Sequence, residues 1–238
     1  MLERGVLSTN SLKHSRMRLK ENNKAVMHAV TIHPRMRKSP TEVSILKSVK
    51  DNDKMGKGGV VITKGRWRGM PMFQMSLEER ATCPRTCQQW TNCFGNNMAF
   101  AHRIDHTHPE FMSRLEAEID DLARMYSYGF VIRPHVLGDY FSKEYAEFWV
   151  RMTKKHKMLR IFGYTHHLRD SEIGQIIQQW NGDDRIWVRF SDQGGPMSAN
   201  VGTDHDGFTC PEQTGDTRSC LTCGACWSTT RAVNFLEH

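Results

Sequence analysis

The feature that most constrains the fold is an alternation of helical and strand-like patterns between residues 109 and 190. Apolar residues recur at helical spacing in some segments and form short continuous runs in others. Strand, helix and strand in this order predict parallel strands joined by right-handed crossovers. We therefore expect an α/β fold built as a partial or irregular β/α barrel. The expected helices span residues 109–126, 142–152 and 170–180, and the expected strands span 130–137, 159–165 and 186–190.

The segment upstream of this alternation is less regular. Short strands are predicted at 59–63 and 70–75, and a helix at 96–104. Residues 1–55 are polar and weakly periodic, which favours a basic N-terminal arm. The expected division is an arm at 1–55 and an α/β metal-binding domain at 56–238.

Polar residues follow each predicted strand. Because ligands of parallel sheets bind beyond the carboxyl ends of the strands, these residues should lie close together at that edge of the sheet. Asp139, His166 and Asp192 are the candidates for acid–base or substrate-orienting work. The alternatives are that Asp139 caps a helix, that His166 faces solvent and that Asp192 belongs to a turn. The candidate cofactor-binding residues beside them are Tyr140, Thr165, Ser191 and Gln193.

All seven cysteines fall into two groups, a distribution that buried structural cysteines do not usually show. Reduced thiols at short spacings favour metal binding, and their odd number argues against full disulfide pairing. We therefore expect a metalloprotein. The first group, the cysteine trio, is Cys83, Cys87 and Cys93, and the second, the cysteine quartet, is Cys210, Cys220, Cys223 and Cys226.

The spacings favour iron–sulfur over zinc without deciding between them. In the quartet, a C-x2-C-x2-C run resembles ferredoxin cluster loops, whereas structural zinc more often uses two separate C-x2-C pairs. Three cysteines around a four-iron cluster leave one iron open for a cofactor. The alternatives are a zinc centre that combines the trio with a histidine, or one site shared by both groups. The histidines considered for the zinc centre are His102, His106 and His108.

Charge is distributed unevenly along the chain. Residues 1–70 contain 16 Lys and Arg against 5 Asp and Glu, and the remaining residues contain 17 against 21. A basic segment suggests a nucleic acid or nucleotide partner, although a solvated arm would look the same. No run of 18 apolar residues and no secretory signal is present, so we expect no membrane contact and a cytoplasmic location. The oligomeric state is not determined by these patterns.

The segment from Gly138 to Thr165 resembles the phage gene-product-88 family. Members of that family carry Gly-Asp-(Phe/Tyr)-x-Ser, then Tyr and Trp on a helix, then a strand that ends in Tyr-Thr. The cysteine trio and the C-P-x-Q-T-G…C-x2-C-x2-C ending are also similar. The resemblance covers about residues 70–228 and implies a phage or prophage origin, hence host cytoplasm, but little chemistry. The matching positions are Gly138, Asp139, Tyr140, Ser142, Tyr145, Trp149, Tyr164 and Thr165.

A looser similarity is to radical S-adenosylmethionine enzymes, whose partial barrels place a three-cysteine cluster loop after the first strand. Here a strand, the trio, a helix and successive βα units follow one another in a similar order. The usual spacing is C-x3-C-x2-C, and this chain has five residues in the second gap. The resemblance implies S-adenosylmethionine as a possible cofactor.

Three functions are compatible with these features. The first is an iron–sulfur enzyme, with one or two 4Fe–4S clusters, acting on a nucleotide or nucleic acid. The second is a zinc-dependent base-exchange or base-modifying enzyme in which Asp139 or Asp192 is the nucleophile. The third is a non-enzymatic, metal-stapled protein that binds nucleic acid or a host protein.

Overall fold

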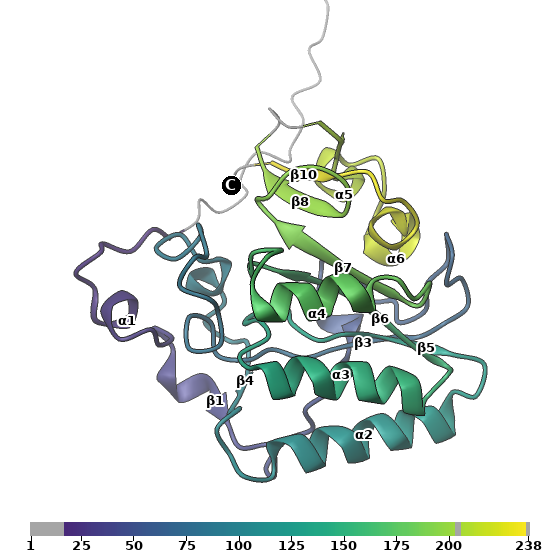
Figure 1. The fold of residues 1–238 in the computed structure, drawn as a ribbon, viewed down its shortest axis with the longest axis horizontal. Coiled ribbons are helices and arrows are strands. Elements are labelled where there is room, and N and C mark those ends of the chain that lie inside the picture. The colour runs from purple at the N-terminus through teal and green to yellow at the C-terminus, as the bar shows by residue number, and fades with distance from the viewer. Residues whose placement is uncertain (1–16, 203–205, 237–238) are drawn as a thin grey trace, which may run out of the picture.

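The structure, a computed structural model, describes residues 17–202 and 206–236. Its centre is a sheet of eight strands in the order β2-β3-β5-β6-β7-β8-β10-β9, and neighbouring strands are parallel except for β2 and β3. The α/β prediction is confirmed. The sheet stays open, with β2 and β9 at its edges, and does not close into a barrel (Figure 1). The strands are β2 (Lys47–Ser48), β3 (Met72–Gln74), β5 (Phe130–Arg133), β6 (Leu159–Thr165), β7 (Ile186–Ser191), β8 (Ser198–Val201), β9 (Phe208–Thr209) and β10 (Val233–Phe235).

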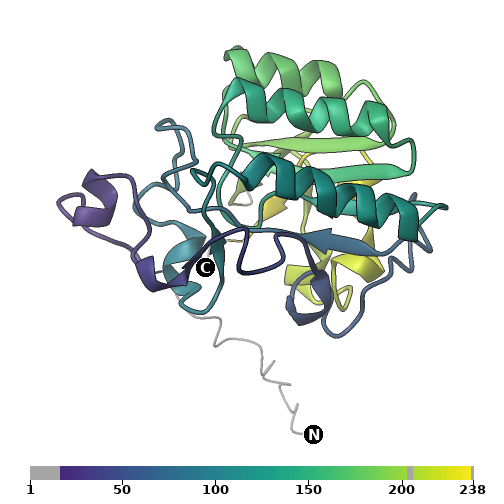
Figure 2. The same ribbon diagram turned by 90° about the horizontal axis from the view of Figure 1, so that it is seen from below.

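Three amphipathic helices cover one face of the sheet (Figure 2). They are α2 (Phe111–Met125), α3 (Lys143–Lys155) and α4 (Glu172–Trp180), close to the predicted helices. Two of them begin at serine caps: the side chain of Ser142 accepts a hydrogen bond from the N–H of Tyr145, and the side chain of Ser171 accepts one from the N–H of Gly174. Their apolar faces pack against the sheet and form with it the larger of two hydrophobic cores.

The opposite face of the sheet carries the smaller core, which is covered by residues 49–67 and by the C-terminal segment (Figure 2). Trp67 and Trp227, from these two segments, stack with ring centroids 5.9 Å apart. Phe162 of β6 packs edge-on against Trp227 at 4.8 Å. The segment 49–67 and the C-terminal segment are therefore in contact on this face of the sheet. The remaining short elements are α1 (Lys24–Met27), η1 (Pro34–Met36), η2 (Val49–Asp51), η3 (Phe94–Asn97), α5 (Pro211–Thr214), α6 (Cys220–Cys223), η4 (Ala225–Trp227) and the parallel pair β1 (Arg37–Lys38) and β4 (Arg103–Ile104).

Three predicted elements were wrong or too long. The helix predicted at 96–104 is the single turn η3 followed by β4, because the buried Asn96 side chain bonds to the carbonyls of Met17 and Thr91 and competes with helical bonding. The strand predicted at 59–63 contributes only an isolated bridge from Val61. The strand predicted at 130–137 ends before Pro134, which has no N–H to donate to the sheet.

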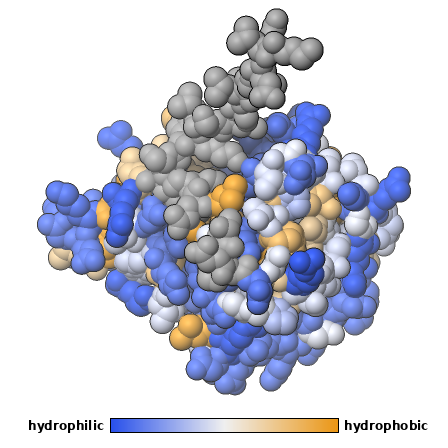
Figure 3. Space-filling model, turned by 90° about the horizontal axis from the view of Figure 1, so that it is seen from above, coloured by the Kyte–Doolittle hydropathy of each residue, from blue (hydrophilic) through white to orange (hydrophobic). Residues whose placement is uncertain are grey.

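The basic segment is only partly described, since residues 1–16 of the expected arm lie outside the described residues. Within 45–55, Ile45 and Leu46 are buried in the larger core and Val49 and Met55 in the smaller one. The expected boundary at residue 55 stays a prediction. Among the described helices, none is long and apolar enough to cross a membrane. The face seen from above is hydrophilic over most of its area, with small separate hydrophobic patches (Figure 3).

Candidate functional site

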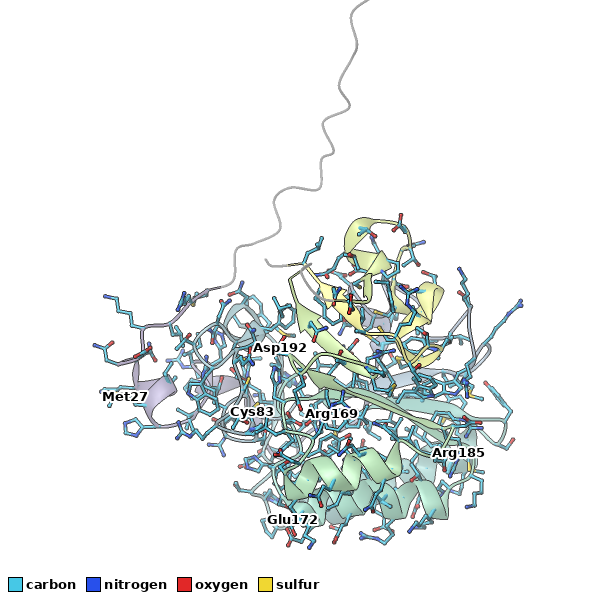
Figure 4. All side chains as sticks on the ribbon, turned by 45° about the horizontal axis from the view of Figure 1, so that its top comes forward. Met27, Cys83, Arg169, Glu172, Arg185 and Asp192 are labelled. Carbon is cyan, nitrogen blue, oxygen red and sulfur yellow. The ribbon has the colours of Figure 1, made fainter. Side chains whose placement is uncertain are left out.

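Four loops meet at the carboxyl edge of the parallel strands. The trio loop follows β3, and single polar residues follow β5, β6 and β7. Figure 4 labels Cys83 of the trio loop and Asp192 of the loop after β7. Electrostatic contacts join Cys83 to Asp139, and His166 to both Cys87 and Asp192. The fold therefore places these residues at one edge of the sheet, as the sequence predicts. We call the group the carboxyl-edge site, and it consists of Cys83, Cys87, Cys93, Asp139, His166 and Asp192.

Asp139 connects two of these loops. Its Oδ1 accepts hydrogen bonds from the N–H of Tyr140 at 2.8 Å and the hydroxyl of Thr165 at 2.9 Å, and its Oδ2 accepts one from the N–H of His166 at 2.7 Å. The side chain is 1% exposed. A buried carboxylate with both oxygens bonded holds the loops after β5 and β6 in register. Asp139 does not cap α3, because that cap is Ser142.

His166 and Asp192 form the polar pair of the site. His166 Nε2 lies 3.6 Å from Asp192 Oδ2, and Asp192 Oδ1 accepts a hydrogen bond from the N–H of Val201 at 3.0 Å. Burial lowers the pKa of His166, but the nearby Asp192 and Cys87 favour the protonated imidazole, outweigh that effect and raise the pKa to about 10. The imidazole is therefore a proton donor held beside a thiol.

The three residues of the trio are partly exposed, and their thiols lie within electrostatic range of one another. Burial is the main reason that the pKa of Cys83 is raised well above its usual value, and nearby Asp139 raises it further. The other two thiols of the trio also add to this shift, so all three lie within electrostatic range. Burial likewise raises the pKa of Cys93 to about 11, against the opposing N–H of Gly95. As free thiols, Cys83 and Cys93 are protonated at neutral pH.

A buried ionic network supports the trio loop, and sequence reasoning missed it. Arg80 donates from Nε to the carbonyl of Trp90 at 3.0 Å and from Nη2 to Asn96 Oδ1. Glu79 accepts two hydrogen bonds from Arg103, at 2.8 and 3.1 Å. The only available sequence signal was a charged run, Glu78 to Arg80, a few residues after an apolar strand.

The four residues expected to bind a cofactor are placed differently from one another. Tyr140 is fully buried, and its ring packs against His135 and Tyr145 in the larger core. Thr165 is engaged by Asp139. Ser191 ends β7 and is partly exposed. Gln193 joins the loops after β6 and β7, since its amide accepts from the N–H of Arg169 and donates to the carbonyl of His167.

The quartet lies apart from this site, on the back of the sheet. Cys210 and Cys226 are buried in the smaller core, and Cys220 packs against it. Burial is the main cause that raises the pKa of Cys220, and Cys226 and Cys210 raise it further. The hydroxyl of Tyr164 donates to Cys226 Sγ at 3.5 Å. The trio and the quartet therefore form two groups, each with its own surroundings.

The histidines considered for a zinc centre have other neighbours. His102 Nδ1 lies 2.9 Å from Lys47 Nζ, His106 packs against Phe141, and His108 Nδ1 accepts the N–H of Glu110. The histidine next to the trio is His166. Over residues 17–202 and 206–236, no group of three or more His, Cys, Asp or Glu side chains is arranged to hold a metal ion as it stands. Metal binding would require the thiols to rotate toward a common centre.

Comparison with known proteins identifies the family. The family model described as gene product 88 matches residues 45–195, which is more than half of the chain. The chain belongs to the gene product 88 family. The resemblance seen in the sequence is thereby confirmed, and the match includes the entire carboxyl-edge site while ending before the quartet. No curated protein and no solved structure matches the chain.

Proposed function

We propose that this gene product 88 protein is an iron–sulfur enzyme that acts on a nucleotide or nucleic acid in the host cytoplasm, with its reaction centre at the carboxyl-edge site. The observation that carries the proposal is the meeting of three thiols with the His166–Asp192 pair at the ends of parallel strands. Soft thiolate donors suit iron–sulfur clusters, and only three of them at one site leave one iron open.

A backbone contact of Cys93 also supports the proposal of an iron–sulfur cluster at this edge. The N–H of Gly95 points at the thiol of Cys93, and backbone donors of this kind favour the thiolate form that a metal needs. An open-iron cluster bound there would supply a coordination position for a cofactor such as S-adenosylmethionine, together with electrons. His166, held by Asp192, would keep a proton beside the reacting centre.

A polyanionic substrate is favoured by the charges around the trio loop. The N–H of Leu19 donates to the carbonyl of Thr91, which brings Arg18 and Lys20 to the rim of that loop. Within the loop, the guanidinium of Arg85 lies 4.7 Å from the centre of the Trp90 ring. Cations next to an aromatic ring are typical of surfaces that bind phosphates and stack bases.

The aspartate-nucleophile alternative is less well supported at Asp139. Both of its oxygens accept hydrogen bonds, and the carboxylate is buried. An attacking nucleophile needs a free oxygen that faces the substrate. Asp192, which faces His166, is the aspartate left for that alternative.

The test is anaerobic purification followed by iron, sulfide and zinc analysis of the wild type and of Cys83→Ser, Cys87→Ser and Cys93→Ser. The conservative variant Thr91→Ser, in the same loop, is the control. We expect each cysteine variant to lose about four iron atoms per chain relative to the wild type. Wild-type protein without iron and sulfide after anaerobic reconstitution, or unchanged iron in all three variants, would overturn the proposal.

The cofactor is tested separately on the reduced, cluster-loaded protein. If S-adenosylmethionine binds the open iron, adding it changes the electron paramagnetic resonance spectrum of the wild type. An unchanged spectrum would remove this cofactor from the proposal and leave the cluster assignment in place.

A further inference from the structure

We propose that the surface around the trio loop binds single-stranded nucleic acid, with an exposed phenylalanine that stacks on a base and neighbouring cations that contact the phosphates. This inference rests on the proposed function, because it specifies the substrate as a single strand rather than a free nucleotide or a duplex. We call this surface the stacking surface, and its residues are Arg18, Lys20, Lys47, Phe94, Phe100 and His102.

The first observation is the composition of residues 83–102. This segment contains no Asp and no Glu, although the whole chain contains 26 of them. Among its side chains are five amides, three aromatic rings, one arginine and one histidine. A surface without carboxylates does not repel phosphates, and aromatic rings beside cations are typical of surfaces that bind single strands.

The second observation is the exposure of two aromatic rings in this segment. Phe100 is 91% exposed and Phe94 is 48% exposed, whereas the other phenylalanines of the chain are buried or half-buried. An exposed ring offers its face to a nucleobase, and stacking of this kind does not depend on which base is present. The bases of a duplex already stack on one another, so exposed rings favour a single strand.

The backbone that carries Phe100 is held in place from inside the protein. The guanidinium of Arg103, which is 0% exposed, donates hydrogen bonds at 3.0, 3.0 and 2.6 Å to the carbonyls of Gly95, Met98 and Ala101. These carbonyls point inward, while the Phe100 side chain points to solvent. A ring on a fixed backbone loses little conformational freedom when a ligand binds, which favours binding.

Lys47 supplies a positive charge next to this ring. Its Nζ lies 2.9 Å from Nδ1 of His102, two residues after Phe100. Burial, together with Lys47 and Lys38, lowers the pKa of His102, so the imidazole is neutral at pH 7. A neutral imidazole accepts the hydrogen bond of the ammonium without neutralising its charge, which remains available to a phosphate.

The N-terminal segment brings two more cations to the same surface. The N–H of Met17 donates to Oδ1 of Asn97 at 2.8 Å, and the N–H of Leu19 donates to the carbonyl of Thr91 at 3.0 Å. The exposed side chains of the segment therefore lie beside residues 91–97. An open pocket of about 550 Å³, a volume typical of ligand sites, is lined by Arg18, Leu19, Lys20, Glu21, Asn22 and Thr91.

The stacking surface is continuous with the carboxyl-edge site. Phe94 directly follows Cys93 of the trio, and only the short turn η3 separates it from the segment that carries Phe100. A single strand that crosses Phe100 and Phe94 therefore passes beside the trio loop.

The experiment measures the fluorescence anisotropy of labelled oligothymidylate, oligouridylate and a DNA duplex with the full-length wild type, Phe100→Ala and Phe100→Tyr. The matched control is Tyr128→Ala, which removes another exposed ring, 63% exposed, near the amino end of β5. We expect Phe100→Ala to weaken single-strand binding roughly 10-fold, because stacking is lost. Phe100→Tyr keeps a ring and should bind like the wild type, and Tyr128→Ala should have no effect.

A second variant tests the phosphate contact. Lys47→Gln should reduce the slope of log K against log salt concentration by about 0.7, as expected for one phosphate contact on a single strand. Thermal unfolding checks that the variants are folded, and Phe100→Ala should keep the wild-type Tm because the ring is exposed.

The proposal is overturned if the wild type binds no single strand, if it binds the duplex as tightly, or if Phe100→Ala and Tyr128→Ala weaken binding equally. Binding of either single strand through Phe100 supports it, and the tighter strand identifies the substrate as DNA or RNA. The result is separate from the iron analysis. Protein that holds no cluster but binds single strands through Phe100 would reject the proposed enzyme and keep the stacking surface. Cluster-loaded protein that binds no strand would reject the stacking surface alone.

Discussion

The guanidinium of Arg103 donates from Nε and Nη2 to the two carboxylate oxygens of Glu79, at 2.8 and 3.1 Å, with both side chains at most 1% exposed. Arg103 also donates to the carbonyl of Gly95, inside the segment that follows the trio. The pair therefore connects the end of β3 to the support of the trio loop. Stability and the shape of the candidate site depend on the same buried ion pair.

Removing one charge of this pair should be costly. Glu79→Gln leaves Arg103 buried without its counter-ion, and we expect the free energy of unfolding to fall by about 3–5 kcal/mol. Urea denaturation followed by circular dichroism measures the change. The control is Glu172→Gln, which breaks the exposed Lys143–Glu172 bridge and should have little effect. Equal losses in the two variants would contradict the role of the buried pair.

Acid should destabilise the protein through His135. Burial, supported by Arg133 and His167, lowers its pKa from 6.5 to about 4. Between these pH values the folded protein binds fewer protons than the unfolded chain, so stability is full above pH 6.5 and falls as the pH drops toward 4. The shift corresponds to roughly 3 kcal/mol.

The variant His135→Gln tests this prediction, since the amide of glutamine can still bond to the hydroxyl of Tyr145. Urea unfolding at several pH values should give a flatter acid limb than in the wild type. An identical pH dependence in the two proteins would show that His135 is not the group responsible.

Gly138 should tolerate no side chain. Its φ is +84°, and a Cβ there would lie 2.5 Å from Oγ1 of Thr82 and 2.7 Å from Cβ of Leu77. Gly138→Ala combines backbone strain with overpacking, so we expect a loss of roughly 3 kcal/mol or more. The matched control is Gly58→Ala, where φ is +90° and nothing lies within 4 Å, so only the strain remains. Thermal unfolding compares the two, and equal losses would rule out the steric contribution.

If the substrate is a nucleic acid, binding should depend on the basic rim of the trio loop. The double variant Arg18→Gln/Lys20→Gln should reduce the slope of log K against log salt concentration by about 1.4, because each phosphate contact on a single strand contributes about 0.7. Fluorescence anisotropy with a labelled single strand at several salt concentrations gives the slope. The control, Lys154→Gln/Lys157→Gln, removes two exposed charges at the end of α3 and just after it. An equal reduction in both would indicate a diffuse effect of net charge.

Sequence patterns were sufficient to predict those elements whose structure depends on residues adjacent in the sequence. Apolar spacing predicted α3 and α4, because a helix is built from residues that are adjacent in the sequence. The meeting of Asp139, His166 and Asp192 also followed from sequence, since parallel strands put their carboxyl ends at one edge. The helix expected at 96–104 failed because Asn96 bonds to Met17, a residue 79 positions away.

The sequence by itself determined the alternating α/β order, the two cysteine groups and the polar residues that follow the strands. Only the tertiary structure decided that the sheet is open, that Glu79 pairs with Arg103, and that Arg189 lies buried beside the quartet. The physical reason is distance along the chain. Spacing fixes what neighbouring residues do, whereas burial and ion pairing are set by segments that meet only after the chain has folded.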